Sequence, residues 1–236
     1  MTRMSRRAFV ADAAMFGTAL VLGGCASTPE GGDMASSAVA PDAAGMSSYA
    51  LMYGPVPDER FAVPAVDLSK IDPAFLRREV PYRGSEAPGT VVISPAERYL
   101  YHVQPGGRAV RYGVGVGKEG FEWSGVATIN SKQEWPDWYP PAEMIERRPD
   151  IKEQLVELRS GMGVPGGLRN PIGARGLYLW QNNEDTLFRI HGTNEPHTIG
   201  KSVSSGCIRM INQDVMHLYE RVPIGSEVKV LPVAVG

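Results

Sequence analysis

The stretch LFRIHGTNEPHTIGKSVSSGCIRM, residues 187–210, holds two of the chain's four histidines and one of its two cysteines. The apolar run at residues 187–190 leads into His191, and turn-forming residues fill much of the interval before Cys207. Gly206 directly precedes the cysteine, and glycine permits the unusual backbone angles and close approach that a nucleophile turn needs. The stretch predicts a strand ending at His191 and then a turn-rich loop that presents Cys207.

Short runs on either side of this stretch have the composition of β-strands. Residues 90–103 (TVVISPAERYLYHV) and 109–117 (AVRYGVGVG) alternate apolar and polar positions and are rich in Val, Ile and Tyr. Residues 177–180 (LYLW) and 226–233 (SEVKVLPV) have the same character. The 27 glycines and 19 prolines favour a turn-rich, strand-rich fold over a helical bundle.

Two segments have the composition of helices. Residues 140–161 form the longest candidate, which Pro149 should break in two because proline removes a backbone donor. Residues 212–225 form the second, with Asn212 as its N-cap and Asp214 in its first turn. Together with the strands, these segments predict a β-rich domain that carries one or two short helices.

Length and charge limit the classes of function. The 236 residues, 43% hydrophobic and 21% charged, suit one soluble globular domain with additions, and we place that domain at residues 88–234. The formal charge of −2 gives no electrostatic reason to expect nucleic acid as a partner.

The first 25 residues have the composition of an export signal. Arg6 and Arg7, within SRRAF, resemble the twin-arginine class, and the apolar run that follows is too short for a comfortable membrane span. Residues 22–25 (LGGC) resemble the lipobox of bacterial lipoproteins, in which the cysteine is acylated and becomes the mature N-terminus. Cleavage elsewhere, with Cys25 discarded, is the alternative.

Residues 26–87 lie between this signal and the domain. Up to Tyr49 they are rich in Ala, Ser, Gly, Pro and Asp, which predicts a flexible tether, and the remainder is a lead-in segment of mixed composition. We expect a protein of the cell envelope on the periplasmic face, anchored by lipid at Cys25. The outer membrane is favoured because Ala26, rather than Asp, follows the cysteine.

With Cys25 acylated or removed, Cys207 has no partner for an internal disulfide. A buried structural cysteine is one interpretation. A zinc site of His191, His197 and Cys207 is another, but the spacings match no common zinc motif. A nucleophile is the third, with His191 as base and the backbone N–H groups of Gly206 and Cys207 as oxyanion donors.

The segments IHGTNEP, TIG, VSSGCIRM and N-x-D resemble the catalytic signature of the L,D-transpeptidases, the YkuD-type domain, over roughly residues 88–233. The resemblance implies a β-sandwich-like catalytic domain with neither cofactor nor metal. It implies that the thiolate attacks a peptidoglycan tetrapeptide stem, forms a thioester and releases D-Ala. The acyl group then passes to an amine, from another stem in a 3→3 cross-link or from a lysine of an envelope protein.

The resemblance also assigns roles to single residues. Cys207 is the nucleophile, His191 the base and proton donor, Gly192 the source of the carbonyl that orients His191, and Gly206 an oxyanion donor through its N–H group. We expect substrate to be bound by Arg209, Ser204 and Ser205, with bracing of the nucleophile loop as the alternative role of Arg209. Many members have a histidine where this chain has Ser205, so no role of that histidine is carried over.

Other functions stay open at this point. Water as acceptor would make the protein an L,D-carboxypeptidase, and loss of chemistry would leave a catalytically inactive peptidoglycan-binding lipoprotein. A sortase-like transpeptidase also places histidine before cysteine, but much farther upstream. His197 competes with His191 as base, and its place in a turn-rich loop makes it the weaker candidate.

Overall fold

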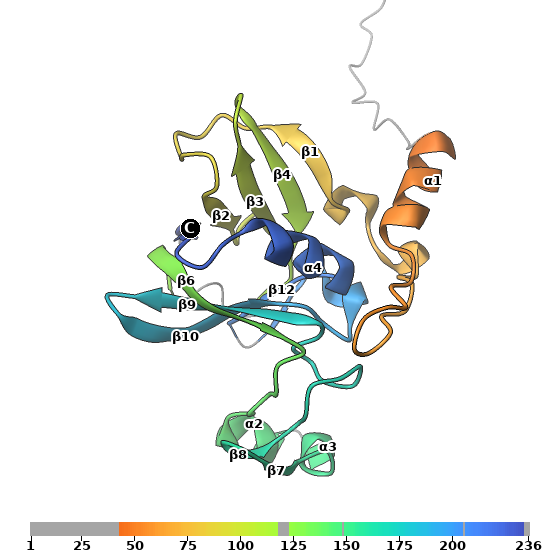
Figure 1. Cartoon of the computed structure of the whole chain (residues 1–236), viewed down its shortest axis with the longest axis vertical. Coiled ribbons are helices and arrows are strands. Elements are labelled where there is room, and N and C mark those ends of the chain that lie inside the picture. Colours follow the sequence, from red (N-terminus) through yellow and green to blue (C-terminus); the bar gives the residue numbers. More distant parts are fainter. Residues whose placement is uncertain (1–42, 118–122, 148, 205, 234–236) are drawn as a thin grey trace, which may run out of the picture. The chain divides into compact units, whose positions relative to one another are not determined.

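The computed structural model describes residues 43–117, 123–147, 149–204 and 206–233 (Figure 1). The expected signal peptide at residues 1–25, with Cys25, and also Ser205 lie outside these described residues. Strands predominate in the described ranges and the helices are short, so the predicted mainly β fold class is confirmed. None of the helices in these ranges is long and apolar enough to cross a bilayer.

A nine-stranded sheet frames the described part of the chain. Its strands, in spatial order, are β1 (Arg78–Pro81), β4 (Arg108–Gly113), β3 (Tyr99–Gln104), β2 (Val91–Ser94), β13 (Glu227–Val230), β6 (Gly125–Glu134), β9 (Arg175–Gln181), β10 (Glu184–His191) and β12 (Ile208–Arg209). Two neighbouring pairs are parallel, β2 with β13 and β10 with β12, and the others are antiparallel. Parallel neighbours need a crossover, and the one between β10 and β12 is the loop that follows His191.

Helix α4 (Asn212–Arg221) packs within the main core. One buried cluster joins side chains of α4 to both halves of the sheet, and it includes Val215, Leu218, Ile93, Leu100, Leu177 and Ile190. Figure 1 shows α4 between β1–β4 and the group of β6, β9 and β10. The two groups of strands thus bury their apolar faces together with the helix, which gives the sandwich-like layering.

Helix α4 begins one residue earlier than predicted, at Asn212 itself. Ile211 is in the N-cap position and makes no side-chain capping bond, while Asn212 is the first helical residue. The prediction that Asn212 caps the helix was therefore wrong. Its side-chain oxygen accepts hydrogen bonds from two other loops instead.

The predicted helix over residues 140–161 forms only in its first part. α2 (Ala142–Arg147) and α3 (Pro149–Lys152) are two short helices, as the proline predicts. β7 (Val156–Leu158) and β8 (Gly161–Gly163) follow as an antiparallel hairpin. Gly161 has a φ of +116°, a conformation that glycine adopts without strain, so this glycine begins a strand rather than ending a helix.

The remaining elements are short. They are α1 (Ala43–Met52), the parallel pair β5 (Val116–Gly117) and β11 (Ser202–Ser204), and the 3₁₀ helices η1 (Leu68–Lys70), η2 (Pro73–Phe75) and η3 (Pro196–Thr198).

Residues 49–81 pack against the domain, although sequence patterning placed its start near Pro88. Tyr53 is buried, and its hydroxyl donates to the Asp214 carboxylate over 3.1 Å. Arg77 forms an ion pair with the same carboxylate at 3.2 Å. Tyr53 and Arg77 do not belong to a run of residues with strand or helix periodicity. Hydrophobic patterning therefore did not predict that they contact the first turn of α4.

Candidate active site

The pairing of β10 with β12 brings His191, at the end of β10, beside the strand that directly follows Cys207. Ile190 lies opposite Ile208, and His191 lies opposite Arg209. Ile190 and Ile208 are fully buried and face the core. Because alternate residues of a strand point to opposite faces, His191 and Arg209 lie on the other face, and Cys207 comes directly before β12.

His191 ends β10 and is buried. Its Nδ1 lies 2.6 Å from the backbone oxygen of Gly192. A carbonyl oxygen only accepts, so Nδ1 carries the hydrogen and Nε2 is the nitrogen that takes a proton. Burial lowers the pKa of His191 to about 4, although a backbone hydrogen bond to Gly192 acts against that shift. The imidazole is therefore neutral at neutral pH and available as a base.

Cys207 is half-buried immediately before β12. Its Sγ lies 3.9 Å from the backbone oxygen of Leu187. Burial raises the pKa of the thiol, while a backbone hydrogen bond from Arg189 and the charges of Arg189 and Arg209 act in the opposite sense. At neutral pH the resting pair is therefore a thiol and a neutral imidazole. Such a pair requires the proton to move to His191 as the sulfur attacks.

Gly206 sets the backbone conformation directly before Cys207. Its φ is +117°, within the region where a side chain causes strain. A Cβ atom added there would lie 3.2 Å from Cε1 of Phe188, which stacks on Trp123 with ring centroids 5.5 Å apart. An aromatic wall therefore lies against this turn, and only glycine fits the position without a shift.

A β-bulge in β10 lies against Cys207. The pairing with β9 is irregular between Asp185 and Arg189, and Leu187 within that interval has a φ of +63°. The backbone N–H of Leu187 donates to Asp185 Oδ1 over 2.9 Å. The bulge thus places the Leu187 carbonyl near Cys207, in keeping with the frequent use of bulges beside active sites.

Two guanidinium groups lie close enough to His191 and Cys207 to shift the pKa of each. Arg209 Nη1 lies 3.2 Å from Glu195 Oε2, and the Glu195 side chain is 49% exposed. Arg189 is held more firmly, because both of its terminal nitrogens lie 2.7 Å from the Asp185 carboxylate. Both arginines lower the pKa of Cys207 and of His191, so positive charge favours a thiolate and disfavours an imidazolium.

The other expected site residues are placed as follows. Ser204 pairs with Gly117 across β11 and β5, while Ser205 lies outside the described residues. His197 is exposed within η3. Among the residues that the structure describes, no group of three or more His, Cys, Asp or Glu side chains is arranged to hold a metal ion.

A family model of the L,D-transpeptidase catalytic domain, YkuD, matches residues 88–230, more than half of the chain. The chain belongs to this family. Probable L,D-transpeptidase ErfK/SrfK of Escherichia coli (strain K12) is 34% identical over 146 residues, which cover 60% of this chain and 43% of the relative. The match thus spans less than half the length of that relative.

Two solved structures are also similar to the chain. The structure of a probable carnitine operon oxidoreductase from Brucella melitensis is 47% identical and covers 72% of this chain and 98% of that one, with a TM-score of 0.44. L,D-transpeptidase 3 from Mycobacterium tuberculosis, in complex with a faropenem-derived adduct, is 16% identical. It covers 61% of this chain and 60% of that one, with a TM-score of 0.41.

Sequence reasoning missed Arg189 in this L,D-transpeptidase domain. The residue lies two positions before His191, so strand alternation alone would have placed both side chains on one face. The ion pair of Arg189 with Asp185, four positions earlier in the same strand, could not be predicted from alternation, because a β-bulge separates the two residues. The guanidinium also lies over the ring of Tyr178, with 4.5 Å between its central carbon and the ring centroid.

Proposed function

We propose that this protein is a cysteine-dependent L,D-transpeptidase that acts on the tetrapeptide stems of peptidoglycan. The observation that supports the proposal best is the pairing of β10 with β12, which sets His191 opposite Arg209, two residues beyond Cys207. The hydrogen bond between His191 and the Gly192 carbonyl supports it, because it leaves Nε2 as the nitrogen that can take the thiol proton.

The first half-reaction is acylation of Cys207. His191 takes the thiol proton at Nε2 while Sγ attacks the carbonyl carbon of the third stem residue. The N–H groups of Gly206 and Cys207 donate to the oxyanion that forms. When this intermediate collapses, the carbon–nitrogen bond to D-Ala breaks and His191 returns the proton to the leaving amine. A thioester on Cys207 and free D-Ala result.

The second half-reaction transfers the acyl group. An incoming amine attacks the thioester carbonyl, His191 removes the proton from its nitrogen, and the sulfur leaves to become the thiol again. A stem amine gives a 3→3 cross-link, and a lysine of an envelope protein gives attachment of that protein. Water in the same place gives an L,D-carboxypeptidase.

Arg209, Ser204 and Ser205 are the proposed substrate-binding residues. A guanidinium binds a carboxylate through two parallel hydrogen bonds, and the stem carries carboxylates near the bond that breaks. Arg209 is suited to this role because its partner Glu195 is half exposed, so a substrate carboxylate can displace it. Arg189, which Asp185 already holds through two contacts, is less suited to exchange.

We also propose that the protein is exported and anchored by lipid at Cys25, with the catalytic domain facing peptidoglycan. The motifs SRRAF and LGGC support this location. The outer membrane is favoured by Ala26 after the cysteine.

Purified stem peptides test the proposal directly. The protein without its expected signal peptide, residues 26–236, is the soluble domain used in the tests. We expect it, incubated with a disaccharide tetrapeptide, to release D-Ala and to give a product whose mass identifies the acceptor. A dimer mass indicates cross-linking, and a tripeptide mass indicates water as acceptor. No D-Ala release by a folded domain would reject the proposed function in favour of an inactive peptidoglycan-binding protein.

A further inference from the structure

The peptide unit between Gly192 and Thr193 has hydrogen bonds on both of its polar groups. Its carbonyl oxygen, on Gly192, accepts from His191 Nδ1 at 2.6 Å. Its N–H, on Thr193, donates to Asn212 Oδ1 over 3.2 Å. Because both groups belong to one planar unit, the bond to Asn212 fixes the direction in which the carbonyl points at the imidazole.

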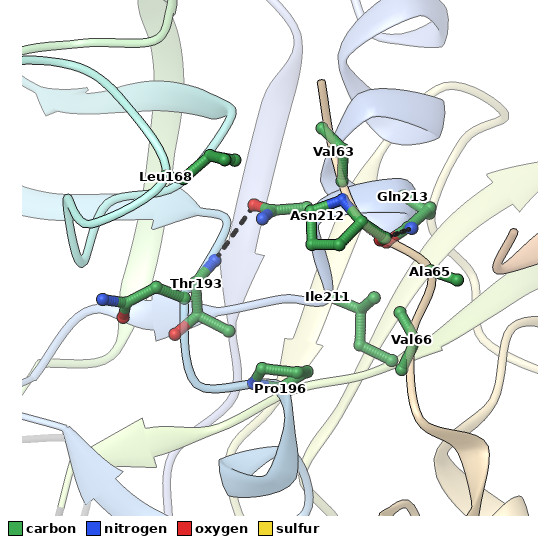
Figure 2. A pocket seen from close by; sticks show the side chains of 11 residues that line it. Val63, Ala65, Val66, Leu168, Thr193, Pro196, Ile211, Asn212 and Gln213 are labelled. Atoms are coloured by element: carbon green, nitrogen blue, oxygen red, sulfur yellow. Dashed lines mark hydrogen bonds between the residues drawn. The ribbon is translucent and has the colours of Figure 1, made fainter. Parts of the chain in front are cut away.

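Asn212 reaches this peptide from the first turn of α4. Figure 2 shows its side-chain oxygen directed at the backbone nitrogen of Thr193, beside a small pocket of about 100 Å³. The same oxygen accepts a second bond, of 3.0 Å, from the backbone N–H of Ala174. One atom therefore ties the loop after β10 to the loop before β9.

Two glycines make room for this amide. A Cβ atom added to Gly192 would lie 2.1 Å from Asn212 Oδ1, and one added to Gly173 would lie 2.3 Å from it. Gly173 also has a φ of +69°, where a side chain causes strain. Neither position accepts a larger residue while Asn212 stays in place, so the two loops are built around this side chain.

The loop before β9 also contacts His191. A backbone hydrogen bond to Ile172 raises the pKa of His191, in the same sense as the bond to Gly192. Ile172 is two residues before Ala174, whose N–H donates to Asn212. The two backbone segments whose hydrogen bonds raise the pKa of His191 are thus held by one amide oxygen.

We propose that Asn212 is the positioning residue of His191, acting through the Gly192–Thr193 peptide. The role rests on the proposed function of His191 as base. Hydrogen bonds in such a chain polarise one another, so the bond to Asn212 also makes the Gly192 carbonyl a better acceptor. The result is an imidazole kept in its Nδ1–H form, with Nε2 ready for the thiol proton.

Four variants test this role. Asn212→Leu removes the acceptor at similar size, and Asn212→Ala replaces it if the leucine variant does not fold. Asn212→Asp keeps an acceptor oxygen. Gln213→Met is the matched control, because Gln213 is the next residue of α4 and its Nε2 donates to the backbone oxygens of Gly54 and Pro64 at 3.0 Å each.

Two measurements are made on each folded variant: the tautomer of His191 by nitrogen-15 NMR without substrate, and the rate at which a carbapenem acylates Cys207. We expect Asn212→Leu to lose the pure Nδ1–H form and to acylate about 10- to 100-fold more slowly, by analogy with the loss of groups that orient metal-binding histidines. Asn212→Asp should keep both properties and move the acid limb of the rate upward in pH, because its charge favours an imidazolium. Gln213→Met should lower only the melting temperature.

An unchanged tautomer and rate in Asn212→Leu would overturn the proposal, as would equal slowing in Gln213→Met. The NMR result does not depend on the reaction catalysed. If the wild-type domain releases no D-Ala, the proposed function fails, while the tautomer still decides whether Asn212 positions His191.

Discussion

Burial sets the protonation states of the two central side chains. It lowers the pKa of His191 to about 4 and raises the pKa of Cys207 above its ordinary value. The resting pair is therefore neutral on both sides, unlike the thiolate–imidazolium pair found in some cysteine enzymes. In the proposed reaction, attack by sulfur and proton transfer to the imidazole are then parts of one step.

This state predicts the pH dependence of acylation. An ordinary histidine with a pKa near 6.5 would lose its base form as the pH falls through that value. His191, with its lowered pKa, should keep its base form until much closer to pH 4. We expect the rate of Cys207 acylation by a carbapenem, measured by stopped-flow absorbance, to lose its acid limb only below about pH 5. A half-maximal rate between about pH 6 and 7 would contradict this assignment.

The choice between the two histidines is a second prediction for single residues. His191→Gln should lower the rate of acylation by roughly 10²-fold, the scale of losing a general base. His197→Ala is the matched control, because His197 is exposed in η3, and it should change the rate far less. Mass spectrometry of the adduct on Cys207 measures both rates. Greater damage from His197→Ala would move the base to the loop.

At the scale of elements, an ion pair joins the lead-in segment to the strand beside the site. Glu59 holds Arg175, the first residue of β9, at 2.6 Å and accepts from Trp135 Nε1 at 3.0 Å. The backbone oxygen of Arg175 in turn accepts from Gly192 N–H over 3.1 Å. The lead-in segment therefore braces the strand that borders the loop after His191.

We expect Glu59→Gln to lower the free energy of unfolding by about 1–3 kcal/mol, because it leaves the Arg175 charge poorly paired in a buried setting. Glu79→Gln is the control, since its pair with Arg108 is half exposed and should contribute below about 1 kcal/mol. Urea unfolding compares the two. Equal losses would mean that the lead-in segment does not stabilise the domain through Glu59.

Sequence reasoning reached the local parts of this structure and missed the non-local ones. The alternating strands and the end of β10 at His191 follow from periodicity and composition. The register that sets Ile190 opposite Ile208 joins strands separated by a long loop, and no local pattern encodes it. The prediction that Asn212 caps the helix was wrong because the two N–H groups that donate to its side-chain oxygen lie on loops distant in the sequence.

At the scale of the whole molecule, the proposed anchor can be tested by fractionation. Cys25→Ala should move the protein from the membrane to the soluble periplasmic fraction, because a stable anchor needs the acylated cysteine. Cys207→Ala is the matched control and should stay with the membrane, since it leaves LGGC intact. Immunoblots of fractionated cells measure where each variant partitions. Membrane partitioning of Cys25→Ala equal to that of the unaltered protein would reject the lipid anchor.

The central claim is that Cys207 carries the acyl group. It is tested most directly by intact-protein mass spectrometry of the soluble domain mixed with tetrapeptide stems, followed by peptide mapping. We expect a thioester on Cys207, together with D-Ala release, in the unaltered protein. We expect neither in Cys207→Ala, whose circular dichroism and melting curve should show a folded protein. Continued D-Ala release by folded Cys207→Ala, or an adduct mapped to another residue, would show that Cys207 is not the nucleophile.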